Sequence, residues 1–179
     1  MAEQDIVTTM ATPPFVAELR SLVGHRPLWL STAAAVVLGG EGHVLLGRRT
    51  DTGRWALPGG IIDPAEQPAD AAVRECFEET GVMVVPEALT SVSVSPPRIY
   101  ANGDQVRYLE LTFRCRAVGG EARVNDEESL EVRWHPLDAL PELDEDELSL
   151  LTQAVRGNGR AAYEFSGLGE VLGLAGSAG

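Results

Sequence analysis

The chain has 179 residues, 44% of them hydrophobic, and its 27 acidic and 14 basic side chains give a net charge of −13. A domain holds roughly 100–200 residues, so the length predicts one domain whose core needs neither disulfides nor a structural metal. The negative charge argues against binding of DNA or RNA polymers and favours divalent cations as partners.

The pattern along the chain predicts a mobile leader at residues 1–13, a single domain at 14–157, and an extension at 158–179 that is mobile at its end. We find no basic leader and no apolar run near the roughly 18 residues that a membrane span requires. The two cysteines, Cys76 and Cys115, lie in apolar patterns, which excludes a disulfide scaffold. We therefore expect a protein of the reducing cytoplasm that does not bind membranes.

The first predicted element is a short helix that begins at Pro14 and docks through apolar residues at helical spacing. A homodimer formed through this helix is a further expectation. A hairpin follows, with an apolar run at residues 33–38, a glycine-rich turn, and a second strand at 43–46.

Residues 105–118 alternate as a half-buried strand does, which places Leu111 on the core side and Tyr108 and Thr112 on the water side. Asn102-Gly103 before it predicts a tight turn from a strand that includes residues 91–94. Further strands are expected at 121–124 and 130–135. A last helix is expected at 145–155, with Asp144 as its N-cap and a buried stripe of Leu148, Leu151 and Val155.

Strands and helices are interspersed without a regular βαβ alternation. This order predicts an α+β fold with a mixed, largely antiparallel sheet and helices on its faces, rather than a Rossmann sheet. Gly59-Gly60 also lacks the GxGxxG spacing of a dinucleotide loop and the GK[ST] of a P-loop.

An acidic helix is predicted at residues 67–80, and it ends at Gly81. Glu75, Glu78 and Glu79 project from one patch of this helix, where like charges repel by roughly 0.2–0.5 kcal/mol per pair and oppose the helix dipole. A bound Mg²⁺ or Mn²⁺ would reverse both penalties, because such ions prefer hard oxygen ligands. The alternative is a solvated acidic face on an acidic protein.

Residues 60–82 resemble the Nudix box, GX5EX7REUXEEXGU with U apolar, and all nine specified positions match. The flanking WALPGG and LEVRWHPLDAL extend the resemblance to about residues 29–157. The resemblance implies an α/β/α sandwich and hydrolysis of a diphosphate linkage in a nucleoside diphosphate derivative. It also implies metal ligands from the Gly60 carbonyl and from Glu75, Glu78 and Glu79, whose geometry Arg74 and Glu66 would maintain.

In this family the metal activates a water that attacks phosphorus. A carboxylate outside the box often serves as the base or as an extra ligand, and here we prefer Glu128, in the loop before the strand at 130–135. Glu127, Glu131 and Glu78 remain alternatives for this role, and a plain polar turn remains the alternative for the loop.

Five side chains outside the box are predicted to bind substrate: Arg48, Arg49, Arg54, Arg98 and Tyr100. Solvated loop arginines are the alternative. Pro97 resembles a proline of ADP-ribose hydrolysing members, whereas Tyr100 resembles a tyrosine of dinucleoside polyphosphate hydrolysing members.

The resulting hypothesis is a metal-dependent pyrophosphohydrolase similar to ADP-ribose pyrophosphatases. The alternatives are a MutT-like nucleoside triphosphate pyrophosphatase and a non-catalytic sensor of nucleotide sugars. An isopentenyl diphosphate isomerase is disfavoured, since Cys76 belongs to the inward stripe of the acidic helix.

Overall fold

The structure is a computed structural model that describes residues 12–157, 159–167 and 171. Residues 1–11 of the predicted leader and the end of the predicted C-terminal extension lie outside the described residues. The elements in chain order are α1 (Pro14–Val23), β1 (Leu28–Leu38), the short 3-10 helix η1 (Gly40–Gly42), β2 (His43–Arg49), β3 (Trp55–Ala56), β4 (Gly59–Ile61), α2 (Pro68–Thr80), β5 (Val82–Val94), β6 (Arg98–Ile99), β7 (Gln105–Gly120), β8 (Ser129–Pro136), α3 (Glu145–Arg156) and β9 (Ala162–Tyr163).

The strands form one mixed sheet in the order β3-β2-β1-β7-β5-β9, with β4 beside β1, β6 beside β7 and β8 beside β2. Strands β1 and β7 run parallel along the whole of β1, from Leu28 opposite Val106 to Leu38 opposite Arg116. The short pairing of β5 with β9 is also parallel, and the other pairings are antiparallel. The predicted mixed, largely antiparallel sheet is therefore confirmed.

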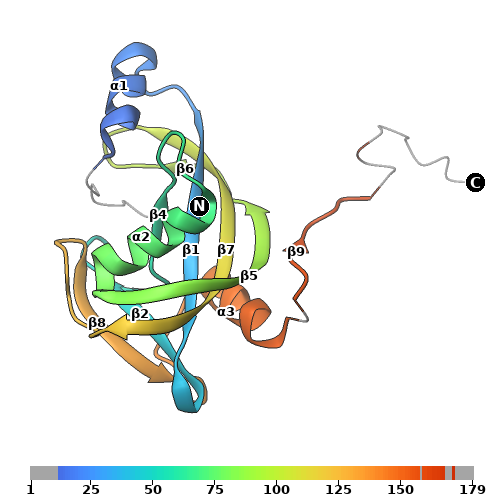
Figure 1. Cartoon of the computed structure of the whole chain (residues 1–179). Helices are drawn as coiled ribbons and strands as arrows, with labels where there is room; N and C mark the ends of the chain where they lie inside the picture. The colour runs from blue at the N-terminus through green and yellow to red at the C-terminus, as the bar shows by residue number, and fades with distance from the viewer. Residues whose placement is uncertain (1–11, 158, 168–170, 172–179) are drawn as a thin grey trace, which may run out of the picture.

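The two faces of the sheet are covered by different helices, because side chains alternate along each strand. Ala35 and Val37 of β1 pack with Cys76 of α2, whereas Val36 packs with Leu151 of α3. In Figure 1, α2 lies across the near face of the strands. This arrangement confirms the expected α/β/α sandwich.

Helix α1 covers one end of the sheet on the face opposite α2. Val16 is buried in a cluster with Leu30, Val106 and Tyr108, which confirms a docking helix after Pro14. Leu22, by contrast, is 76% exposed and lies outside this contact.

The predicted core face of β7 is confirmed at Cys115, which is buried with Cys76 of α2, but the predicted water face is wrong at two positions. Tyr108 and Thr112 are 8% and 1% exposed, although the alternation placed them toward water, and Leu111 is only half-buried. The reason is that their face is covered at one end by α1 and forms the floor of a cleft farther along. A strand buried on both faces does not follow the simple rule of one wet and one dry side.

Of two other local predictions, one is wrong and the other is confirmed only at Leu151. Residues 121–124 form no strand, because the chain leaves the sheet after β7 and passes over the C-terminal end of α2, where the Arg123 amide donates to the Thr80 carbonyl. The buried stripe of α3 is Leu151 and Ala154, whereas Leu148 and Val155 are 46% and 40% exposed. The helix is thus rotated relative to the predicted stripe.

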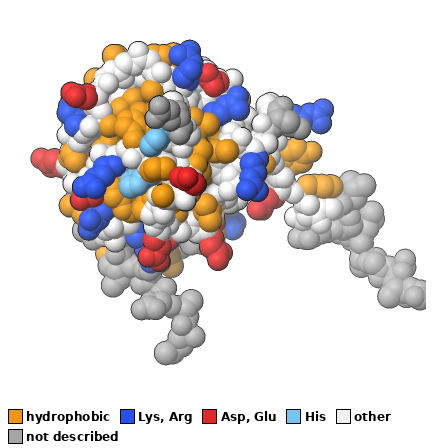
Figure 2. Space-filling model, turned by 90° about the horizontal axis from the view of Figure 1, so that it is seen from below, with side chains coloured by type: hydrophobic (Ala, Val, Ile, Leu, Met, Phe, Trp, Pro, Cys, Tyr) orange, Lys and Arg blue, Asp and Glu red, His pale blue; other side chains and the backbone are white. Residues whose placement is uncertain are grey.

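The outer surface carries mixed charges. Figure 2, which views the molecule from below, shows hydrophobic side chains gathered in the middle of this face with arginines and carboxylates scattered around them. Positive and negative side chains are therefore interspersed on this face, although the net charge of the chain is −13. Among the described helices, none combines the length and the apolar character that spanning a bilayer demands.

Candidate active site

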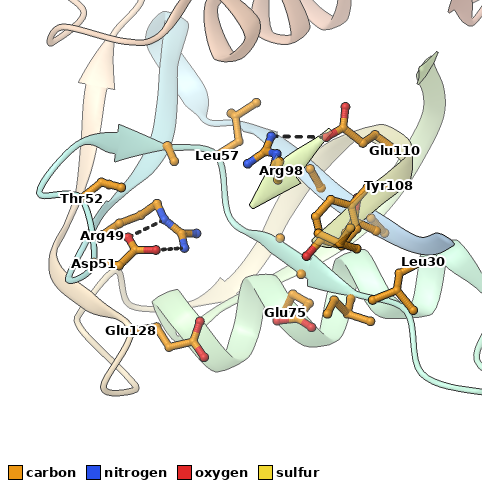
Figure 3. A pocket seen from close by; sticks show the side chains of 18 of the residues that line it. Leu30, Arg49, Asp51, Thr52, Leu57, Glu75, Arg98, Tyr108, Glu110 and Glu128 are labelled. Atoms are coloured by element: carbon orange, nitrogen blue, oxygen red, sulfur yellow. Dashed lines mark hydrogen bonds and ion pairs between the residues drawn. The ribbon is translucent and has the colours of Figure 1, made fainter. Parts of the chain in front are cut away.

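A cleft of about 380 Å³ lies between α1 and α3 and extends to α2. Its floor consists of facing residues of the parallel pair, with Leu30 beside Tyr108, Thr32 beside Glu110 and Ala34 beside Thr112. Gly60 of β4 and Glu75 of α2 line the middle of the cleft. Figure 3 shows Glu75 between Arg49 and Asp51 on one side and Tyr108 and Leu30 on the other.

The boundaries of α2 fix the orientation of its acidic side chains. Pro68 occupies the first turn, where its missing N–H costs nothing, and Gly81 ends the helix in the left-handed conformation with φ of 71°. The Gly81 amide donates to the Phe77 carbonyl. The predicted acidic helix is therefore confirmed, within one residue at its start.

The three carboxylates of α2 lie in different surroundings. Glu75 lines the cleft, and Glu79 is directed beneath the loop before β4, where it accepts the Gly59 amide at 3.2 Å. Burial raises the pKa of Glu79 well above its ordinary value, and it also raises the pKa of Glu75, with further repulsion from Glu78 and Glu128. The side chain of Glu78 is 53% exposed and does not line the cleft.

Arg74 holds this acidic cluster together from behind the cleft. Its Nη1 donates to Glu75 at 2.7 Å and to Glu78 at 3.0 Å, and its Nη2 also reaches the carbonyl of Ile61. Its Nε and Nη2 donate to the two oxygens of Glu66, and these bonds lower the pKa of Glu66. Arg74 and Glu66 therefore support the cluster rather than face the cleft.

The residues of this site fit a hard divalent cation. Their donors are carboxylate and carbonyl oxygens, the ligands that Mg²⁺ and Mn²⁺ prefer. A Cβ on Gly60 would lie 2.5 Å from the Glu75 carboxyl carbon, so the missing side chain lets this carboxylate lie against the Gly60 backbone. Among the described residues, no group of three or more His, Cys, Asp or Glu side chains is already arranged as a metal site.

Arg49 and Asp51 form the wall on the α3 side of the cleft. The guanidinium binds both oxygens of Asp51, at 2.9 and 2.6 Å, and is also attracted by Glu79 and Glu128. Burial alone would raise the pKa of Asp51, but the hydrogen bonds and charge of Arg49 lower it. Sequence reasoning missed Asp51, whose only signal is its place two residues after a predicted binding arginine.

The other predicted site residues divide into two groups. Glu128, Arg54, Arg98 and Tyr100 line the cleft. Arg48 does not, since its side chain bonds the Gly53 carbonyl at 3.1 Å and lies 3.9 Å from a carboxylate of β8.

Asp144 is at the N-cap position of α3, but its side chain makes no capping bond, which corrects the predicted cap. Its carboxylate instead pairs with Arg54 at 2.7 Å, at the edge of the cleft. This ion pair connects the start of α3 to the loop before β3.

Glu147 of α3 also lines the cleft, and sequence reasoning missed it. It accepts the Leu57 amide at 3.0 Å, and burial raises its pKa to about 7. The loop between β3 and β4 is thus held by carboxylates from both helix layers, Glu147 at Leu57 and Glu79 at Gly59. In the sequence, Glu147 is only one of several acids in a first helical turn, where acids are common.

The sequence model of the NUDIX domain matches residues 29–154. The chain belongs to the Nudix family. Nudix hydrolases generally use divalent metal cations, and the domain together with its hydrolase relatives identifies the chain as a Nudix hydrolase. The acidic cluster described above lies within the matched residues.

Three Nudix relatives illustrate the similarity. A MutT-like protein of Streptomyces ambofaciens is 36% identical over 65% of this chain and 70% of its own. An ADP-ribose pyrophosphatase of Methanocaldococcus jannaschii is 30% identical over 79% of this chain and 83% of its own. The crystal structure of an ADP-ribose pyrophosphatase from Streptococcus suis superposes with a TM-score of 0.60 at 26% identity, covering 75% of this chain and 98% of that one.

Proposed function

We propose that this Nudix hydrolase cleaves the diphosphate bond of a nucleoside diphosphate derivative, namely ADP-ribose or another nucleotide sugar. The observation that carries the proposal is the length of the cleft, which continues to both sides of Gly60 and Glu75. A diphosphate held at this centre has room for an organic group on either side. The similarity to an ADP-ribose pyrophosphatase over 83% of that protein supports the same substrate class.

In this proposal Glu75, Glu78, Glu79 and the Gly60 carbonyl hold Mg²⁺ or Mn²⁺. The ion would neutralise phosphate oxygens and lower the pKa of an attacking water. Arg74 keeps the carboxylates in place, since its guanidinium contacts two of them and Glu66.

Outside the box, Glu128 lines the cleft beside Glu75 and takes the proton of the water that attacks phosphorus. Arg49 and Arg54 bind phosphate or ribose oxygens at the α3 end of the cleft. The sequence-based alternatives to Glu128 are Glu127, Glu131 and Glu78. Glu127 is exposed, and Glu131 pairs with arginines of the sheet, which supports Glu128.

A second candidate is a MutT-like pyrophosphatase that releases pyrophosphate from nucleoside triphosphates. It is favoured by the 36% identity to a MutT-like protein. The two reactions differ in their products: a nucleoside monophosphate with a sugar phosphate in the first, and a nucleoside monophosphate with pyrophosphate in the second. A sensor without hydrolysis is the third candidate, and the complete set of box carboxylates argues against it.

The test is a product analysis over ADP-ribose, other nucleotide sugars, dinucleoside polyphosphates and nucleoside triphosphates, with Mg²⁺, with Mn²⁺ and with chelator. We expect ADP-ribose or another nucleotide sugar to be hydrolysed best, and chelator to abolish turnover. Pyrophosphate release from triphosphates alone would replace the proposal with the MutT-like activity. Binding of nucleotide sugars without any turnover would favour the sensor.

A cytoplasmic location and a homodimer remain proposals as well. The apolar stripe of α1 around Val16 is used inside the domain, so a dimer would have to use other exposed apolar residues, such as Leu22 and Trp29. Sedimentation of the full chain at micromolar concentration would test the dimer.

A further inference from the structure

We propose that the end of the cleft beneath α1 binds the nucleobase of the substrate, so that the substrate lies with its base under α1 and its sugar toward α3. This α1 lobe is defined by Val16, Leu30, Val106, Tyr108, Tyr100 and Arg98. The inference rests on the proposed function and adds the direction in which the substrate binds.

The walls of the lobe are apolar. Val16, Leu30, Val106 and Tyr108 all line the cleft and are each less than a tenth exposed. They come from α1, β1 and β7 and form one packed cluster. Walls of this kind favour a flat aromatic ring, whose faces need no hydrogen bonds, over a sugar whose hydroxyl groups would lose water without replacement.

Two tyrosine hydroxyls give the same lobe a polar tip. The hydroxyls of Tyr100 and Tyr108 lie 2.7 Å apart, and each hydroxyl can both donate and accept. Because one bond joins the pair, the remaining donor and acceptor positions can meet the edge of a heterocyclic base. The Arg98 guanidinium lies 5.9 Å from the centre of the Tyr108 ring and pairs with Glu110 at 3.6 Å, which keeps it at the rim of the lobe.

The opposite end of the cleft, near α3, offers different polar groups. There the cleft is lined by charged groups, among them Arg49, Asp51, Arg54 and Asp144. Such groups form directional bonds with sugar hydroxyls and phosphate oxygens. Arg20 and Asp104 also line the cleft beside α1, where they pair with each other at 3.3 Å, and Leu57 and Leu150 line it near α3. The two ends therefore differ in the polar groups that they offer to a substrate: a pair of tyrosine hydroxyls beside α1, and several charged groups beside α3.

Part of the lobe comes from outside the residues that match the NUDIX domain. The NUDIX match begins at residue 29, whereas Val16 and the rest of α1 precede it. A wall contributed from outside the matched domain can set specificity without altering the catalytic helix.

The experiment compares adenosine monophosphate with ribose 5-phosphate as inhibitors, because the two differ by the base alone. In Tyr100→Phe and Tyr108→Phe the rings remain and one hydroxyl of the pair is lost. We expect the inhibition constant of adenosine monophosphate to rise about fivefold, the equivalent of one hydrogen bond, and that of ribose 5-phosphate to change less than twofold. Tyr163→Phe, at a side chain that is 79% exposed outside the cleft, is the matched control and should change neither.

Arg54→Gln supplies the mirror test at the other end of the cleft, where ribose 5-phosphate inhibition should weaken more than adenosine monophosphate inhibition. The reverse pattern in these variants, or equal effects of the tyrosine variants on both inhibitors, would overturn the inference. Titration calorimetry of adenosine monophosphate in chelator gives the same comparison without turnover. A protein that hydrolyses no nucleotide sugar but loses this binding in the tyrosine variants would therefore refute the proposed function and keep the base site.

Discussion

Arg74 binds Glu66 with two parallel hydrogen bonds, from Nε and Nη2 to the two carboxylate oxygens, each 2.9 Å long. This fork leaves Nη1 to bond Glu75 and Glu78. Glu66, in the segment before the acidic helix, thus fixes the side chain of Arg74. Arg74 in turn holds Glu75 and Glu78, two of the proposed metal ligands.

Arg74→Lys should therefore lower kcat/KM by about 10–100-fold at limiting metal, since lysine keeps the charge but cannot form the fork. Steady-state kinetics over a metal titration measure the effect, and saturating metal should recover part of it. Arg116→Lys, at a surface ion pair with Glu87, is the control. Unchanged kinetics in Arg74→Lys at all metal concentrations would contradict the role of the fork.

Glu75→Gln and Glu79→Gln should each lower turnover at least a hundredfold, while the melting temperature stays the same or rises. Both substitutions remove a charge from a half-buried, like-charged site, and glutamine can still accept the Gly59 amide at position 79. Turnover and thermal melting of each variant are compared with Glu121→Gln, at an exposed carboxylate. Full activity in both variants would remove the metal-site argument.

Glu128→Gln should reduce kcat at least tenfold, because the amide cannot accept a proton from the attacking water. The neighbouring Glu127 is exposed and does not line the cleft, so Glu127→Gln should stay within twofold of the parent. The pH dependence of kcat is the discriminating measurement: loss of the acid limb in the Glu128 variant supports a base. An identical pH profile would assign the base elsewhere.

Glu147→Gln should change how stability depends on pH. Burial raises the pKa of Glu147 from 4.5 to about 7 in the folded protein. Between these two values the folded state binds more protons than the unfolded state, so the contribution of Glu147 to stability falls as the pH rises from about 4.5 to about 7. The variant lacks this loss, so its free energy of unfolding should rise relative to that of the parent by on the order of 2 kcal/mol between pH 4.5 and pH 8.

Urea unfolding of both proteins at pH 4.5, 6 and 8 in chelator measures this difference. Glu145→Gln, at an exposed carboxylate in the same helical turn, serves as its control. A pH-independent difference between parent and variant would place the pKa of Glu147 near its ordinary value.

Local signals explain what the sequence could predict. The acidic helix is bounded by Pro68 and Gly81, whose conformational preferences act within a turn of the helix, and the spacing of its three glutamates places them on one patch. The mixed sheet followed from the irregular order of strands and helices.

Long-range contacts explain what could not be predicted. Tyr108 is buried because α1, from the other end of the chain, packs on its face of β7. Glu147 enters the cleft because its carboxylate meets the Leu57 amide, 90 residues away in sequence. Neither contact changes the hydrophobic pattern of the segment in which it occurs. The pattern therefore predicts the wrong face for Tyr108 and gives no prediction for Glu147.

The parallel pairing of β1 with β7 has a consequence for how the molecule opens. Because these strands are joined by β2–β6 and α2, separating them opens the floor of the cleft and releases α2 in one event. The amides of this pair should exchange with solvent only through global unfolding, whereas the two-residue pairing of β9 with β5 can open locally. Hydrogen exchange should therefore reveal a protected central unit of β1, β7 and α2. The peripheral strand β9 should open and close locally without disturbing this unit.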